Sequence, residues 1–188
     1  MPVNGNLFQE QLIAHGATTL AHMKTGSLFR ILKKDIPNCE ECVWYFQRLC
    51  SPFGYQFTIL KETKDDSLIY VYNETKVSHV LSKPSIQSFL EQYGYESTDV
   101  DSSILHLKER LQGATFPHEI GIFLGYPLQD VLAFITPQKE CLLIGYWRVY
   151  GNAKNIQRTF NRYNCLTKTM EQKLAMGEPF VDILRKLN

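Results

Sequence analysis

The chain has 188 residues, a length that suits one domain, and apolar residues make up 44% of it, enough for a hydrophobic core. It carries 20 basic and 19 acidic residues, for a net charge of +1, and no basic stripe. This balance argues against non-specific binding of nucleic acid. No apolar run approaches the roughly 18 residues of a membrane span, and the first residues lack the pattern of a secretory signal. We therefore expect a single domain, residues 1–188, in the cytoplasm, with neither nucleic acid nor a membrane as partner.

The first third of the chain has clear periodicities. Apolar and small residues at helical spacing predict a helix over residues 6–24. A dense apolar run predicts a strand over residues 27–33. Asn38 is a good N-cap for a helix over residues 39–50.

The middle of the chain predicts a hairpin followed by helices. Residues 55–62 alternate in the manner of a strand, residues 68–72 form a second apolar run, and two aspartates between them indicate a turn. Helical segments follow at residues 76–81, 85–93 and 102–111.

The next part is harder to assign. Apolar runs at residues 120–124 and 142–150 predict two further strands. Between them, a proline at a first helical position favours a short helix over residues 127–135, and a strand over residues 131–135 is the alternative.

At the end of the chain, the sequence predicts a long helix over residues 155–174 and a short amphipathic helix after Pro179. All these elements together predict an α+β fold. We expect one small mixed or antiparallel sheet of about five strands, flanked by helices and comparable with the architecture of cysteine proteases.

The five cysteines are odd in number, and in a cytosolic chain reduced thiols are the default. Cys39 and Cys42 have the C-x-x-C spacing of half a zinc site or of a redox pair. A zinc site needs four ligands, and the sequence has no second C-x-x-C. The glycines match neither a phosphate loop nor a dinucleotide fingerprint. We therefore predict no metal and no cofactor.

Four segments carry a resemblance to a known family. They read ATTLAHMKTGSLF at residues 17–29, FPHEIGIFLGYPLQDVLAFI from residue 116, GYWRVYGN at residues 145–152 and FNRYNC at residues 160–165. In this order they resemble the bacterial family catalogued as domain of unknown function 3793, whose members occur mostly in anaerobic bacteria. The resemblance spans about residues 14 to 175 and implies no established activity.

The resemblance also marks individual positions. Two residues depart from the family pattern: Tyr146 stands where members commonly have cysteine, and Thr18 where they often have proline. The residues that match the pattern are His118, Glu119, Gly121, Gly125, Tyr126, Pro127, Asp130, Trp147, Tyr150 and Gly151.

One group of residues is compatible with acyl-transfer chemistry. His118 stands in the most family-like segment, and Asp130 follows it twelve residues later. In enzymes of the cysteine-protease type, a histidine takes the proton of the nucleophile and a carboxylate fixes the histidine tautomer. The structural alternative is that His118 and Glu119 cap a strand, and that Asp130 caps or starts a helix.

Cys42 is the predicted nucleophile. It lies in CEECVWYF, in the first turn of a predicted helix, where a helix N-terminus can lower the thiol pKa. The neighbouring charges of Glu40 and Glu41 oppose thiolate formation, so a purely structural Cys42 is the alternative. Cys50 and Ser27 are the other candidate nucleophiles.

These observations predict a thiol-type acyl-transfer enzyme of papain-like logic. It would hydrolyse or aminolyse a thioester or amide, on a small molecule or on a peptide bound to a carrier protein. Cys42 would be the nucleophile, His118 the base and Asp130 the residue that orients the base. The predicted substrate-binding residues are Tyr126, Tyr146, Tyr150 and Glu119.

The alternative function is a non-enzymatic binding protein. Its cleft, around the same three tyrosines, would hold a small ligand or a redox partner protein. The distance from His118 to every thiol and hydroxyl distinguishes the two functions, because an enzyme needs a nucleophile within reach of its base.

Overall fold

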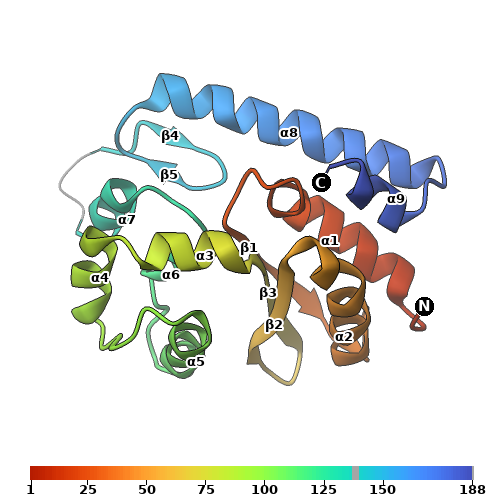
Figure 1. Ribbon diagram of the computed structural model, residues 1–188, viewed down its shortest axis with the longest axis horizontal. Helices are drawn as coiled ribbons and strands as arrows, with labels where there is room; N and C mark the ends of the chain where they lie inside the picture. Colours follow the sequence, from red (N-terminus) through yellow and green to blue (C-terminus); the bar gives the residue numbers. More distant parts are fainter. Residues whose placement is uncertain (137–139, 188) are drawn as a thin grey trace.

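The computed structural model describes residues 1–136 and 140–187 (Figure 1). In chain order, the elements are α1 (Gly5–Leu20), β1 (Gly26–Leu32), α2 (Cys39–Cys50), the 3-10 turn η1 (Ser51–Phe53), β2 (Tyr55–Glu62), β3 (Asp66–Asn73), α3 (Glu74–Leu81), α4 (Pro84–Glu91), α5 (Val100–Leu111), α6 (Ile120–Phe123), α7 (Leu128–Ile135), β4 (Leu143–Ile144), β5 (Arg148–Val149), α8 (Ala153–Ala175) and α9 (Phe180–Arg185).

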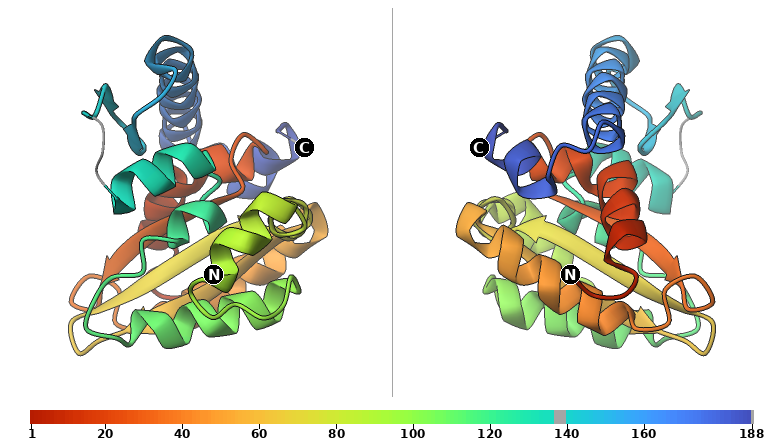
Figure 2. Two further views of the ribbon diagram at one scale, coloured as in Figure 1. Left: turned by 90° about the vertical axis from the view of Figure 1, so that its left-hand side faces the viewer. Right: turned by 90° about the vertical axis from the view of Figure 1, so that its right-hand side faces the viewer.

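A three-stranded antiparallel sheet forms the middle layer, in the order β1-β3-β2. Side chains alternate between its two faces, so each face has its own core. Phe29 and Val71 belong to the first core, with α1, α2 and parts of α8 and α9. Tyr70 and Tyr72 belong to the second core, with side chains of α3 to α7. Figure 2 shows α1 and α2 on one side of the sheet and α5 on the other.

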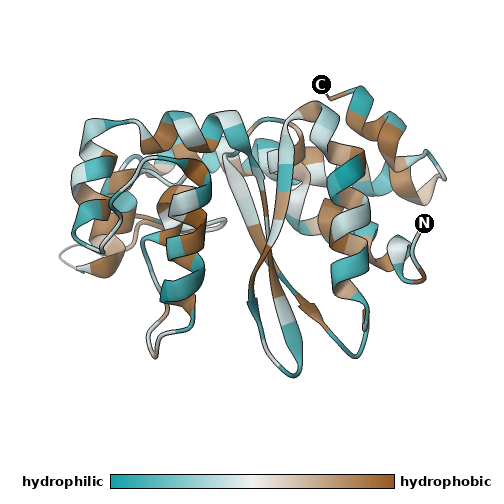
Figure 3. Ribbon diagram, turned by 60° about the horizontal axis from the view of Figure 1, so that its bottom comes forward, coloured by the Kyte–Doolittle hydropathy of each residue, from teal (hydrophilic) through white to brown (hydrophobic). Residues whose placement is uncertain are grey.

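The helices that cover the sheet are amphipathic, and Figure 3 shows apolar and polar residues on different faces of the same helix. Packing of apolar helix faces on a sheet is the arrangement expected of an α+β fold. The predicted fold class is therefore confirmed, with small antiparallel sheets flanked by helices.

The hairpin β4–β5 is a separate two-stranded sheet, in which Leu143 pairs with Val149 and Ile144 with Arg148. It lies beside α8, and both elements share a small third core around Val149, Phe160 and Tyr163. The hydroxyl of Tyr163 donates a hydrogen bond to the carbonyl of Met23, at 3.1 Å. This bond joins α8 to the loop that follows α1, and Met23 of that loop packs against the same third core as the hairpin.

Most predicted elements are present, including the favoured helix over residues 127–135, which is α7. The strand predicted over residues 120–124 is wrong, because this segment forms the short helix α6. A short apolar run fits a buried helix as well as a strand, so periodicity cannot separate them. The single strand predicted over residues 142–150 is instead the hairpin, which turns where the Gly145 amide donates to the Trp147 carbonyl.

Asn38 occupies the N-cap position of α2, as predicted, but its side chain makes no capping hydrogen bond. In the described part of the chain, no helix is both long enough and apolar enough to cross a membrane.

Candidate functional site

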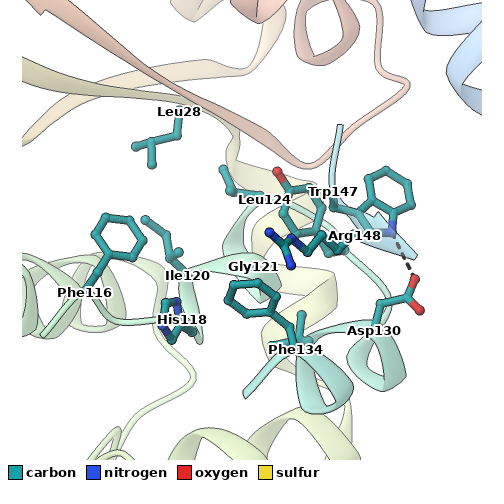
Figure 4. Close-up of a pocket in the computed structure, with 12 residues that line it drawn as sticks. Leu28, Phe116, His118, Ile120, Gly121, Leu124, Asp130, Phe134, Trp147 and Arg148 are labelled. Carbon is teal, nitrogen blue, oxygen red and sulfur yellow. Dashed lines mark hydrogen bonds between the residues drawn. The ribbon is translucent and has the colours of Figure 1, made fainter. Parts of the chain in front are cut away.

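A pocket of about 350 Å³ opens where the second core meets the hairpin (Figure 4). Its walls come from β1, the segment before α6, α6 itself, α7 and β5. Two of its aromatic side chains, Phe116 and Phe134, are 51% and 39% exposed. The apolar lining residues are Leu28, Phe116, Ile120, Leu124, Val131 and Phe134.

Asp130 fixes one wall of the pocket. Its carboxylate is 3% exposed and accepts two hydrogen bonds, from the Trp147 indole nitrogen to Oδ2 and from the Tyr150 amide to Oδ1, each at 2.9 Å. Hydrogen bonds to a charged acceptor are stronger than neutral ones. Because α7 begins at Leu128, Asp130 lies in its first turn and ties this helix to the hairpin.

An aromatic stack continues this wall. The rings of Tyr126 and Trp147 stack with centroids 5.1 Å apart, and the rings of Trp147 and Phe160 of α8 form a T-shaped pair with centroids 4.7 Å apart. The Tyr126 hydroxyl donates to the carbonyl of Tyr146 at 2.9 Å. Burial raises the pKa of Tyr126 to about 12, so this hydroxyl stays protonated at neutral pH.

Two glycines allow the close packing behind the pocket. At Gly121, a Cβ would lie 2.8 Å from the Val131 side chain, so glycine lets α6 lie against α7. Gly125 has a φ of 77°, and a Cβ there would lie 2.5 Å from the Thr25 hydroxyl. Glycine adopts this backbone conformation without strain, and here it also brings the segment before α7 against the start of β1.

Two polar side chains stand at the mouth of the pocket. The guanidinium carbon of Arg148 lies 5.7 Å from the ring centroid of Phe134, and the His118 ring meets the same phenyl edge-to-face at 4.9 Å. Both residues are exposed. Within the described residues, Arg148 has no carboxylate within salt-bridge distance.

Lys24 lies behind the Tyr126 wall. It is 9% exposed, and its ammonium stands 5.4 Å from the ring centroid of Tyr126 and 5.9 Å from that of Tyr146. Burial lowers the pKa of Lys24 from 10.5 to about 8, because a desolvated ammonium is disfavoured. The attraction of the two rings for a cation partly offsets this cost.

The structure does not bring the three predicted catalytic residues together. Cys42 is 1% exposed in the first core, and its thiol pKa is raised by burial and by the nearby charge of Glu41. His118 and Asp130 both line the pocket, which lies on the other side of the sheet. No hydrogen bond between them is found in the described residues, and Figure 4 shows Asp130 turned toward Trp147.

The other candidate nucleophiles are also remote from the pocket lining. Cys50 is fully buried in the first core, and burial raises its pKa to about 12. The Ser27 hydroxyl is buried and hydrogen-bonded to Thr19 of α1, at 2.8 Å. Ser27 precedes Leu28 on β1, so the two side chains point to opposite faces of the sheet.

The predicted substrate-binding residues have different positions. Tyr126 lines the pocket. The ring of Tyr146 packs instead on Phe160 and Tyr163, and Tyr150 lines a neighbouring hollow. Glu119 is 1% exposed and forms an ion pair with Arg110, so it is not available at the surface.

Sequence reasoning did not single out Phe134 and Arg148. Arg148 is the one charged residue of the GYWRVYGN segment, a signal that could have pointed to it. In residues 1–136 and 140–187, no group of three histidine, cysteine, aspartate or glutamate side chains is placed to hold a metal ion.

Three of the four segments that resemble a family meet at this site. Residues 17–29 contribute Leu28, residues 116–135 contribute α6 and α7, and residues 145–152 contribute Trp147 and Arg148. No solved structure and no curated protein matches the chain. Residues 12–184 match the family described as Protein of unknown function (DUF3793), and the chain belongs to that family.

Proposed function

We propose that the protein binds a small, largely apolar ligand in this pocket and does not act on it chemically. The observation that carries the proposal is a pocket of about 350 Å³ with apolar and aromatic walls and no cysteine, serine, threonine or lysine among its lining residues. Small-molecule sites are typically concave, mostly apolar and equipped with a few polar groups, and their volumes begin at about 300 Å³.

The exposed aromatic rings at the mouth support the same function. Phe116 and Phe134 keep 51% and 39% of their surface in contact with water. When a ligand covers apolar surface around a hollow, the free energy of the complex falls by about 25 cal/mol for each Å² removed from water. A bound ligand would therefore cover surface that the fold alone leaves exposed.

Acyl transfer is the weaker proposal for this geometry. A general base acts on a nucleophile within about 3 Å, or through one water. The candidate thiols are buried on the far side of the sheet from His118. Treatment with an activated acyl thioester separates the two functions, because the enzyme would be acylated at Cys42 and the binding protein would remain unmodified there.

The test of binding uses isothermal titration calorimetry with 1-decanol and with decanoate. At least one of them should bind the native protein. Replacing Leu28 with Trp should fill the pocket and abolish binding. The matched control is Leu68→Trp, because Leu68 is also half-buried on the same face of the sheet but does not line the pocket. The proposal fails if neither compound binds, or if both variants bind as the native protein does.

The two tryptophans allow the position of the ligand to be checked. Trp147 lines the pocket, whereas Trp44 on α2 is 60% exposed. In a Trp44→Phe variant, Trp147 is the only indole, so a ligand in the pocket should change the fluorescence. Heat of binding without any change in Trp147 emission would place the ligand elsewhere.

A further inference from the structure

The charged groups of the pocket differ in what they offer a ligand. Asp130 is 3% exposed, and each of its carboxylate oxygens already accepts a hydrogen bond from the hairpin. Figure 4 shows it turned away from the hollow, toward Trp147. The carboxylate of Asp130 is therefore poorly placed to accept a hydrogen bond from a ligand in the pocket.

Arg148 is different, because its donors are not engaged by a carboxylate in the described residues. Strand β5 holds its backbone opposite Ile144, and the ring of Phe134 lies 5.7 Å from its guanidinium carbon. In Figure 4 the guanidinium points into the pocket beside this ring. The planar guanidinium presents paired donors that match the two oxygens of a carboxylate.

The apolar walls lie away from this charge. In Figure 4, Leu28, Phe116 and Ile120 stand together on one side of the pocket and Arg148 on the other. A ligand that uses both parts must have an apolar body with an anionic group at one end. The volume of about 350 Å³ lies near the lower end of the range for small-molecule sites, so the apolar body is small.

We infer that the ligand of this pocket is a medium-chain carboxylic acid, with its carboxylate on Arg148 and its chain along Leu28, Phe116 and Ile120. This inference rests on the proposed function and adds the chemical class of the ligand to it. The ring of His118 also meets Phe134, with ring centroids 4.9 Å apart, and lies 6.0 Å from the ring of Phe116 at the mouth of the pocket.

The test compares three compounds with the same ten-carbon chain: decanoate, 1-decanol and decyltrimethylammonium. Their dissociation constants are measured by calorimetry at pH 7.5 and constant ionic strength. Decanoate should bind at least about tenfold more tightly than decanol, because a hydrogen bond to a charged group contributes more than a neutral one. Decyltrimethylammonium should bind most weakly.

Variants assign the difference to one side chain. Arg148→Met should weaken decanoate binding by about 10- to 100-fold and leave decanol binding within about twofold, since only the charged contact is lost. Arg148→Lys should weaken decanoate binding less than Arg148→Met does, because lysine keeps the charge without the paired donors. The control is Arg158→Met, since Arg158 is an exposed arginine on α8.

The outcomes separate this inference from the proposed function. If decanol binds as tightly as decanoate, or if Arg148→Met weakens both equally, the inference is wrong while the pocket still binds apolar ligands. Tightest binding of decyltrimethylammonium would overturn it in the same way. If none of the three compounds binds, the proposed function falls and the inference falls with it.

Discussion

The two sides of the sheet are built differently. The side covered by α1 and α2 is a continuous apolar core, in which Phe8, Phe29 and Phe46 pack ring against ring. The pocket end has a four-residue helix and two-residue strands, and the buried carboxylate of Asp130 joins its pieces. Many weak contacts therefore stabilise the first side, and a few directional contacts shape the second. A single substitution should therefore act through lost packing on the first side and through one charge or one hydrogen bond on the second.

The largest expected effect is on the apolar side. Phe46→Ala should lower the free energy of unfolding by about 3–5 kcal/mol, because the ring is fully buried between Phe8 and Phe180 and leaves a cavity. Urea unfolding measures this loss. The neighbouring exposed residue provides the control, since Trp44→Ala should change stability by only about 0.5 kcal/mol. A loss below about 1 kcal/mol for Phe46→Ala would contradict the described packing.

The buried ammonium of Lys24 at the pocket end should lower the stability of the folded protein at neutral pH. Its pKa is about 8 in the folded protein and 10.5 ordinarily, so the unfolded chain holds more protons between these values. Stability should therefore rise as the pH increases through this window, and the full cost should be present below pH 8. Lys24→Met should stabilise the protein at pH 7 by on the order of 3 kcal/mol, less whatever the two tyrosine rings contribute.

The measurement is urea unfolding at pH 7 and at pH 9.5, and the stabilisation by Lys24→Met should shrink at the higher pH. The exposed Lys154 supplies the control, because Lys154→Met should show no such dependence. Destabilisation by Lys24→Met at pH 7 would mean that the aromatic contacts outweigh the desolvation of the ammonium.

Asp130→Asn should loosen the hairpin selectively. The amide has one acceptor oxygen where the carboxylate has two, so either the Trp147 indole or the Tyr150 amide loses its partner. We expect a loss of about 1.5–3 kcal/mol. Amide hydrogen exchange should become faster over residues 142–150 and stay unchanged in β1 to β3. The control is Asp65→Asn in the exposed turn between β2 and β3, and equal acceleration throughout the chain would argue against a local role.

The smallest effect concerns the predicted nucleophile. Cys42→Ala removes one small buried group from the first core and should cost about 1 kcal/mol. Binding of decanol or decanoate should remain within about twofold of the native value, because the thiol lies on the other side of the sheet. A tenfold change in binding would show that the two sides are coupled.

The same contrast explains what could be predicted from the sequence. Residues 39–50 and 55–62 repeat their apolar positions over several turns or pleats, so pattern alone indicates α2 and β2 correctly. The run at 120–124 is too short for its period to be read. The two hydrogen-bond donors to Asp130 lie 17 and 20 residues away in the chain, and no local pattern records such a pairing.

Residue types alone do not reveal which side chains of the site lie on the same side of the sheet. Cys42, His118 and Asp130 have the chemistry of an acyl-transfer site, but the sheet separates the thiol from the other two. Which face of a strand a side chain occupies decides what it can touch, as Ser27 and Leu28 show on β1. The hairpin places Arg148 beside Phe134, and no local pattern in the sequence records that contact.

The bond between Tyr163 and Met23 joins positions 140 residues apart in the chain, and it has a consequence for folding order. Closing so long a loop costs entropy that only native contacts repay, so contacts of this kind form late. The three-stranded sheet needs only residues up to Asn73. During synthesis, strand pairing can therefore begin early, whereas the third core can close only after α8 has emerged and folded back against the start of the chain.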